Sequence, residues 1–425
     1  MASTTGSAEV GHAGKRIAVI GAGIIGCSTA FHLLKAGARQ VTIIEAREPA
    51  AATTGAGAGF VSHWSAGMFP LGEEGLQLQQ YGLDFYRAIH EVGVEIGYRP
   101  NGTLMMALTE AGRERFVRPV LDSPHAPAEM QDLTARQIGE KTRGLIDATQ
   151  VHSGAFNPHG IQLDTRLATG VMVDEIVKMG GVFRNGTAVT GIYDAGSHVK
   201  IQTDKGEFEV DGVVVAAGAW NNEVLRDLGW RLPLLRVMAT RIVTDGRGLP
   251  STLPTVQCRE LRLWLRESFG AVMWGTGRHY QPYYQTGDDW IEPGQPRNAD
   301  LMQAMDDVEL AQLQKIFPPL RGSKVSSWAQ GVPCYTPDSG LIVGHVPGTT
   351  NVVAVGGDNE TGVSHGPGLG RLSAELILGQ KPFVDTTRFR LDRFARDSYA
   401  TEAEIAAALP AWSGHQPAGP VSLRQ

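Results

Sequence analysis

Three glycines near the start of the chain have the spacing of a phosphate-binding turn. Gly21, Gly23 and Gly26 directly follow the short apolar run Arg16–Ile20 and open a helical pattern that starts with Ile24 and Ile25. The first glycine permits a tight turn, the second permits close approach of a pyrophosphate, and the third permits packing of helix on strand. The helix N-terminus beyond the turn directs unpaired N–H groups and a positive dipole end at the phosphates.

A carboxylate stands at the matching distance from these glycines. Glu45 ends a second predicted strand, Val41–Ile44, and lies 19 residues after Gly26. At this position an acidic side chain hydrogen-bonds the adenosine ribose of a dinucleotide. The alternative is a glycine-rich turn in an unrelated α/β protein, but the complete strand–helix–strand pattern favours a dinucleotide site.

The segment after Glu45 favours FAD over a nicotinamide dinucleotide. Ala46 and Arg47 lead into Ala50–Gly59, a run of small residues that is too rich in glycine for a helix interior. Small side chains let backbone and hydroxyl groups approach a large planar cofactor. The expected contacts from this run are Thr53, Thr54, Gly55 and Gly57.

Composition limits the class of protein. The chain has 425 residues, of which 42% are hydrophobic, and this length suffices for two domains with sizeable cores. The net charge of −6 offers no basic surface for nucleic acid, and no apolar run is long enough for a membrane span. Three separated cysteines predict neither a disulfide framework nor a metal site, and they suit a cytoplasmic protein.

The elements that position these residues predict an α/β protein, α+β overall. It combines a Rossmann-type FAD-binding domain with a substrate domain built on a mixed, largely antiparallel sheet. The expected segments are a disordered N-terminus (1–14), a discontinuous FAD-binding domain (15–75, 150–230 and 327–395), a substrate domain (76–149 and 231–326), and a C-terminal helix and tail (396–425).

Four blocks in the family's order make the chain resemble the D-amino-acid oxidase-like FAD-dependent oxidoreductases. This family includes sarcosine oxidase, glycine oxidase, dimethylglycine dehydrogenase and D-amino-acid dehydrogenase. The blocks are the Gly21–Glu45 fingerprint, the strand Val213–Trp220, the segment Trp328–Asp338, and the glycine-rich run Gly356–Gly368. They are spread over most of the chain and identify the family rather than the substrate.

The resemblance implies further cofactor contacts at Val189, between the first two blocks, and in the later blocks at Ala217, Gly218, Trp220, Gly357, Asp358, Thr361, Gly362, Val363 and Ser364. In the last block a helix is expected to begin at Pro367 and end at Gly379. Its N-terminus would stabilise the negative charge that develops on the reduced flavin. An ordinary surface helix is the alternative.

Two residues raise the question of a covalent bond to the flavin. His63 is the best candidate for a side chain beside the flavin, where a histidine can accept a proton near neutral pH. In the dimethylglycine dehydrogenase branch a histidine of the comparable segment binds FAD covalently, although the spacing differs here. Cys334 lies in the loop where sarcosine oxidases attach flavin, but a buried small-residue role is favoured. Attachment of FAD therefore stays open.

The cations that relatives use for a substrate carboxylate are replaced in this chain. Glycine oxidase-like members have an arginine at the position of Pro333, and sarcosine oxidase-like members have lysines at the positions of Met273 and Ser364. Arg266 could supply a bidentate contact to a carboxylate. It could equally be a solvated strand arginine paired with Glu267.

An aromatic segment suggests the shape of the substrate. His279 is a further catalytic candidate. It precedes Tyr280, Tyr283 and Tyr284, and Trp290 follows them. These rings could wall a pocket for an organic cation, or form a loop or a subunit contact. Without the relatives' cations, glycine and sarcosine are expected to be poor substrates and bulkier secondary amines or amino acids better ones.

The predicted function is FAD-dependent oxidation of the C–N bond of an amine or amino acid to an imine, with hydride transfer to flavin N5. A D-amino-acid dehydrogenase with an acceptor other than oxygen is the first alternative. A non-catalytic subunit that holds FAD for a larger complex is the alternative of another class. The expected partners are a small amine or amino acid and an electron acceptor, for a monomer or homo-oligomer.

Overall fold

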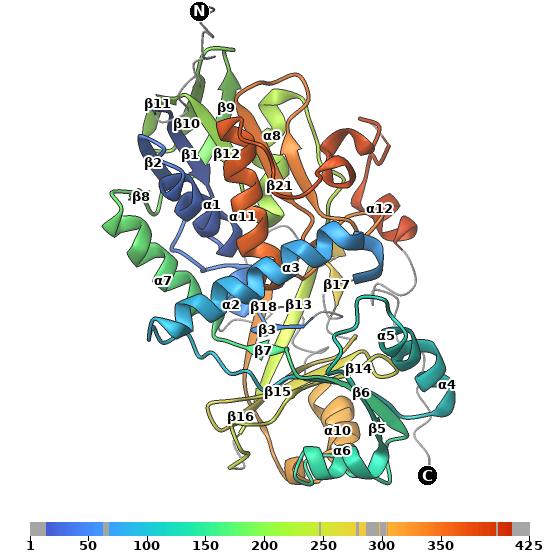
Figure 1. Cartoon of the computed structure of the whole chain (residues 1–425). Helices are drawn as coiled ribbons and strands as arrows, with labels where there is room; N and C mark the ends of the chain where they lie inside the picture. The colour runs from blue at the N-terminus through green and yellow to red at the C-terminus, as the bar shows by residue number, and fades with distance from the viewer. Residues whose placement is uncertain are drawn as a thin grey trace, which may run out of the picture.

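Two sheets organise the molecule, one in the upper half of Figure 1 and one in the lower half. The structure is a computed structural model that describes residues 14–62, 68–245, 248–277, 280–285, 297, 303, 305–396 and 398–409. Within these residues no helix is long and apolar enough to cross a membrane.

The first sheet is parallel except at one edge. Its strands run in the order β20 (Ile342–His345), β21 (Val352–Gly356), β12 (Gly212–Val215), β1 (Arg16–Ile20), β2 (Gln40–Ile44) and β8 (Val182–Arg184), and only the β20–β21 pair is antiparallel. The central strands are almost wholly apolar because both faces of the sheet are covered.

Different layers cover the two faces. Helices α1 (Ile24–Lys35), α7 (Thr165–Lys178) and α11 (Gly362–Leu378) pack on one face and bury residues such as Leu33 and Leu369. The other face packs on the antiparallel strands β9 (Val189–Asp194), β10 (Val199–Thr203) and β11 (Gly206–Val210), and on α8 (Asn221–Leu225). The Rossmann-type arrangement is therefore confirmed.

The second sheet is mixed, as expected. Its order is β17 (Gln281–Pro282), β13 (Leu235–Thr244), β16 (Ala271–Gly275), β15 (Leu263–Ser268), β14 (Thr255–Cys258), β4 (Thr103–Ala107), β6 (Ser153–Asn157) and β5 (Gln131–Thr134). Strands β18 (Val325–Gly331) and β19 (Cys334–Tyr335) also pair with β13. Only β4–β14 is parallel among the pairs of this sheet in the described residues. Helices α6 (Ala135–Lys141) and α10 (Leu310–Ile316) cover one face.

The chain crosses between the sheets at points that differ from the expected segments. Strand β6 falls within residues 150–230 and most of β18 within 327–395, yet both strands pair in the second sheet. Their partners β4 and β13 lie far away in the sequence, so the local pattern of the two strands does not indicate the sheet to which they belong. Helix α3 (Met68–Glu91) runs between the two halves in Figure 1, with Gly72 at a kink.

The predicted helix start at Pro367 is wrong, because α11 begins at Gly362 and contains the proline. A proline inside a helix has no N–H for the carbonyl four residues earlier, which here belongs to Val363. That carbonyl instead accepts a hydrogen bond of 2.8 Å from the hydroxyl of Tyr86 on α3. The small-residue run after Glu45 likewise contains one helical turn, α2 (Thr53–Ala56).

Candidate functional site

The glycine turn is set by packing as well as by its backbone angles. Gly21 has φ +102°, and a Cβ there would lie 2.4 Å from the carbonyl oxygen of Ala216. A Cβ at Gly26 would lie 2.0 Å from the carbonyl oxygen of Gly21. Gly23 differs, because only the hydroxyl of Thr54 lies near its Cβ position, at 3.2 Å. The second glycine therefore leaves the space that a pyrophosphate needs.

Glu45 lies at the carboxyl end of β2, where its carboxylate is oriented by the backbone. One oxygen accepts a hydrogen bond from the N–H of Ala22 and the other from the N–H of Arg47, each at 2.8 Å. Each oxygen keeps lone pairs that could accept ribose hydroxyls. The backbone of Glu45 accepts from Thr187, two residues before the expected contact Val189.

Side chains from distant elements hold the loop of residues 53–59, which we call the cofactor loop. The carbonyl oxygens of Thr54, Gly55, Gly57 and Ala58 each accept a hydrogen bond from a side chain: Thr165 at 2.6 Å, Arg166 at 3.3 Å, Arg241 at 3.0 Å and Arg266 at 2.6 Å, respectively. The hydroxyl of Thr54 in turn accepts from the N–H of Ile24. The cofactor loop is thus tied to the glycine turn and to both sheets.

Arg266 belongs to this support and does not line the cavity described next. Its side chain is 5% exposed, and its guanidinium donates to the carbonyl oxygens of Ala58, Leu163 and Glu267. The carboxylate of Glu267 pairs instead with Arg99. Burial lowers the pKa of Arg266 to about 10, and the nearby Arg241 adds to this shift. Neither expected role, substrate contact or solvated pair with Glu267, matches these contacts.

A cavity of about 620 Å³ extends from the glycine turn to the second sheet. Many of the expected cofactor residues line it: Gly23, Ile24, Ile25, Thr53, Thr54, Gly57, Gly218, Gly357, Asp358, Thr361, Gly362, Val363 and Ser364. The other expected contacts are outside its lining, namely Gly21, Gly26, Glu45, Ala46, Arg47, Gly55, Val189, Ala217 and Trp220. The residues fit FAD, because glycines form the cradle and a Cβ at Gly218 would meet no atom within 4 Å.

The first turn of α11 lines this cavity. Gly362, Val363 and Ser364 belong to that turn, so the positive end of the helix dipole lies beside the cradle. Asp358 precedes the turn, and burial raises its pKa to about 6, against the effect of backbone N–H groups that bond it. The positive end of the helix dipole therefore faces both the cavity and the Asp358 carboxylate, which offsets part of its effect on a ligand.

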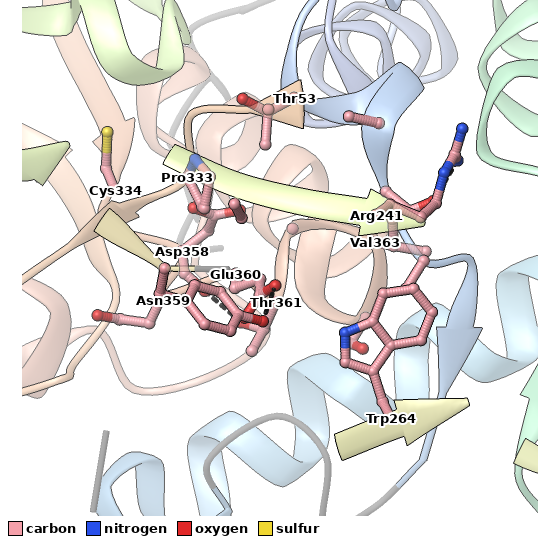
Figure 2. A pocket seen from close by; sticks show the side chains of 18 of the residues that line it. Thr53, Arg241, Trp264, Pro333, Cys334, Asp358, Asn359, Glu360, Thr361 and Val363 are labelled. Carbon is pink, nitrogen blue, oxygen red and sulfur yellow. Dashed lines mark hydrogen bonds between the residues drawn. The ribbon is translucent and has the colours of Figure 1, made fainter. Parts of the chain in front are cut away.

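The wall formed by the second sheet is rich in arginine, which the sequence interpretation missed. Arg115, Arg241, Arg259 and Arg262 line it, together with Trp264. Figure 2 shows Trp264 and Arg241 on one side of the cavity and Cys334 on the other. The sequence analysis named Arg266 as the only candidate cation, and it missed these arginines because they lie outside the motifs that the resemblance covers.

The arginine of this wall that is best suited to bind a ligand is Arg259. In the part of the chain that the structure describes, its guanidinium makes no hydrogen bond and no ion pair. Burial lowers the pKa of Arg259, while the negative potential of Tyr280, Glu360 and Tyr335 opposes the shift. A guanidinium with free donors in a cavity is suited to a bidentate contact with a carboxylate.

Glu360 was also not predicted, although it lies between two expected contacts. Its carboxylate accepts hydrogen bonds from the hydroxyl groups of Tyr280, at 2.5 Å, and Tyr335, at 3.1 Å. Glu360 lines the cavity and keeps an exposed surface, and partial removal of its carboxylate from water raises its pKa to about 7. The two tyrosine hydrogen bonds oppose this shift, whereas the charge of Asp358 adds to it.

The remaining candidates from the sequence are His63, His279, Trp290 and Cys334. His63, His279 and Trp290 lie outside the described residues. Cys334 lines the cavity, and burial raises the pKa of its thiol well above the ordinary value. Within the described ranges no cluster of histidine, cysteine, aspartate and glutamate could hold a metal ion.

Comparison with known proteins adds the family context. A family model described as FAD dependent oxidoreductase matches residues 16–376. Human mitochondrial dimethylglycine dehydrogenase is 24% identical over 395 residues, which are 89% of this chain but 44% of that protein. Glycine oxidase from Pseudomonas aeruginosa is 27% identical over 87% of this chain and 97% of its own length.

The fold is shared with solved structures. The crystal structure of glycine oxidase from Geobacillus kaustophilus superposes with a TM-score of 0.78 at 20% identity, covering 90% of this chain and 99% of that chain. The chain spans less than half the length of the dimethylglycine dehydrogenases that it matches.

Proposed function

Because the chain belongs to the family of FAD dependent oxidoreductases, we propose that it oxidises the C–N bond of an amine that carries a carboxylate. The substrate class is that of amino acids and N-substituted amino acids. The observation that carries this proposal is a cavity that joins the FAD cradle to the guanidinium of Arg259, which forms no ion pair among the residues that the structure describes.

Arg259 supplies the anchor that the relatives' replaced cations would have supplied. A carboxylate bound there is held beside the end of β14, in the same cavity that the glycine turn lines. Charge-assisted bidentate contacts fix orientation as well as position. Small zwitterions are therefore restored as candidate substrates, in contrast to the expectation from the sequence.

Bound FAD supplies the acceptor for the hydride from the carbon next to nitrogen. The chain contributes orientation and electrostatics. The N-terminus of α11 directs its positive dipole end at the cradle, and Trp264 adds an apolar ring to the cavity lining that helps to exclude water.

The test is turnover of the purified chain on paired amines, with oxygen and with an artificial dye as acceptors. Each pair consists of an amino acid and the neutral amine that lacks its carboxylate. We expect the wild type to favour the amino acid, and Arg259→Met to lose this preference mainly through KM. Arg136→Met, at a site 88% exposed on α6, is the matched control.

The outcomes separate the alternatives. Turnover with the dye but not with oxygen identifies a dehydrogenase. FAD binding without turnover of any amine supports a non-catalytic subunit and contradicts the proposal. Equal preference in the wild type and in Arg259→Met removes Arg259 from the site.

A further inference from the structure

We propose that Glu360 binds the ammonium group of the substrate and accepts its proton, so that the neutral amine is the species oxidised. The inference rests on the proposed function for the identity of the site. It adds a second recognition group and a proton-transfer step.

The carboxylate of Glu360 is held in the cavity by two side chains from other elements. The hydroxyl of Tyr280, just before β17, donates to Oε1, and the hydroxyl of Tyr335, on β19, donates to Oε2. Each oxygen keeps a lone pair for a further donor. Figure 2 shows Glu360 and Thr361 near the middle of the cavity.

The backbone at this position is unusual for residues other than glycine. Asn359 has φ +47° and Glu360 has φ +69°, so two consecutive residues adopt the left-handed region. The side chain of Asn359 holds the turn by accepting from the N–H of Thr336, at 3.0 Å, and by donating to the carbonyl of Gly357, at 2.7 Å. Backbone strain that the surroundings enforce is concentrated at functional sites. Here it places the Glu360 carboxylate in the cavity.

The charges around Glu360 suit a zwitterion. The groups that act on it are Tyr280, Tyr335, Asp358 and Arg259. Of these only Arg259 is a cation, and it makes no ion pair within the described residues. A substrate with one ammonium and one carboxylate would therefore satisfy Glu360 and Arg259 together.

The proton transfer is balanced within the site. One N–H bond of the ammonium breaks, its electron pair stays on nitrogen, and the proton forms an O–H bond to Glu360. No oxidant or reductant takes part in this step. The pKa of about 7 supports the assignment, because a general base is most effective when its pKa is near the working pH.

Equilibrium binding to the FAD-loaded enzyme tests the ammonium contact without turnover. The probes are 2-aminoisobutyrate, which has no hydrogen on the carbon next to nitrogen, and pivalate, in which a methyl group replaces the ammonium. Calorimetric titration of the wild type is expected to show roughly tenfold tighter binding of 2-aminoisobutyrate. Glu360→Gln should abolish this preference, whereas Glu140→Gln, at a site 61% exposed on α6, should keep it.

The pH dependence gives a second readout. Binding of an ammonium requires ionised Glu360, so the preference should grow as the pH rises through about 7 and vanish below it. Tyr335→Phe removes a hydrogen bond that lowers the pKa, so it should move this midpoint upward. A positioning role for Tyr335 requires this movement, which a merely structural role would not produce.

The binding of the two probes either supports or overturns the role of Glu360. Equal or undetectable binding of both probes in the wild type, or a preference that survives in Glu360→Gln, overturns the inference. Failure of the proposed function is seen separately, as absence of turnover on the amine panel by a wild type that still prefers 2-aminoisobutyrate.

Discussion

At the scale of single residues, the carboxylate of Glu45 bonds the backbone and can still accept hydrogen bonds from a ligand. Glu45 accepts two backbone N–H groups, which fix its orientation before any cofactor arrives. Among the described residues, the remaining lone pairs of this carboxylate accept no further hydrogen bond. This arrangement is what a ribose diol needs, since preorganised acceptors cost little ordering entropy on binding.

Replacing Glu45 by alanine should therefore weaken FAD binding by about 1–3 kcal/mol, because charge-assisted hydrogen bonds are lost. The measurement is the dissociation constant of FAD from the apoprotein, followed by flavin fluorescence. Glu48→Ala, in the same segment with an exposed side chain, is the control. Equal weakening in both variants would show that loop disturbance rather than a ribose contact is the cause.

The difference between predicted and missed site residues follows from how local their signal is. Gly21, Gly26 and Glu45 were found because one strand–helix–strand unit carries all of them. Arg259 lies in a turn with no motif, and Glu360 lies in the Gly356–Gly368 block without a recognised role, so the fold alone brings the two to one cavity. Consecutive left-handed residues cannot be recognised from the letters Asn-Glu.

At the scale of elements, α11 shows how a proline inside a helix is accommodated. Pro367 leaves the carbonyl of Val363 without its intrahelical partner, and the hydroxyl of the fully buried Tyr86 replaces the missing donor. Sequence rules favour proline at a helix start, which is why the start was placed too late. The true start puts Val363 in the cavity wall.

This account predicts coupling between Tyr86 and Pro367. Tyr86→Phe should lower the free energy of unfolding by about 1–3 kcal/mol, because a buried carbonyl loses its donor. In a Pro367→Ala background the helix N–H returns, so the same change should cost less. Urea unfolding of the four proteins measures the interaction energy. Strict additivity would contradict the exchange of donors.

The cofactor loop gives a second prediction at this scale. Arg266→Met removes the donors to Ala58 and Leu163, so we expect a loss of about 1–3 kcal/mol of apoprotein stability for each carbonyl left unpaired, and weaker FAD retention. Preference for carboxylate-bearing amines should be unchanged, in contrast to Arg259→Met. Urea unfolding and the paired amine assay measure the two effects, with Arg136→Met as control. If Arg266→Met instead lost the preference for carboxylate-bearing amines while its free energy of unfolding stayed unchanged, Arg266 would be a substrate contact.

The pattern of β15 explains why Arg266 was misjudged. Leu263 and Leu265 alternate with Trp264 and Arg266, and such alternation normally indicates one wet face. Here the cofactor loop and Leu163 cover the face of the strand from which Arg266 extends, so the arginine is buried. Periodicity predicts the two faces of a strand, but not which of them another unit covers.

At the scale of the whole molecule, the cavity is shared between the two sheets. The fold class was predictable because each sheet has its own pattern: apolar runs for the parallel sheet and alternation for the other. The sheet to which β6 and β18 belong was not predictable, because pairing between strands far apart in the sequence leaves no local pattern.

A shared cavity predicts that FAD stabilises both sheets. At about 100 times its dissociation constant, FAD should add about 2.7 kcal/mol to the free energy of unfolding. Amide hydrogen exchange should slow in β13 and β18 as well as in β1, because all three pack around the cradle or its supports. Protection confined to β1 and its neighbours would show that the second sheet opens independently.

The supports of the cofactor loop also bear on how the protein is made. Residues 53–59 leave the ribosome early, but their hydrogen-bond donors Thr165, Arg166, Arg241 and Arg266 are synthesised much later. The last part of the cradle, at Gly362 and Val363, follows later still. Synthesis must therefore pass Val363 before FAD meets a complete site, and until then the nascent chain has to keep its parallel strands from misassociating without help from the cofactor.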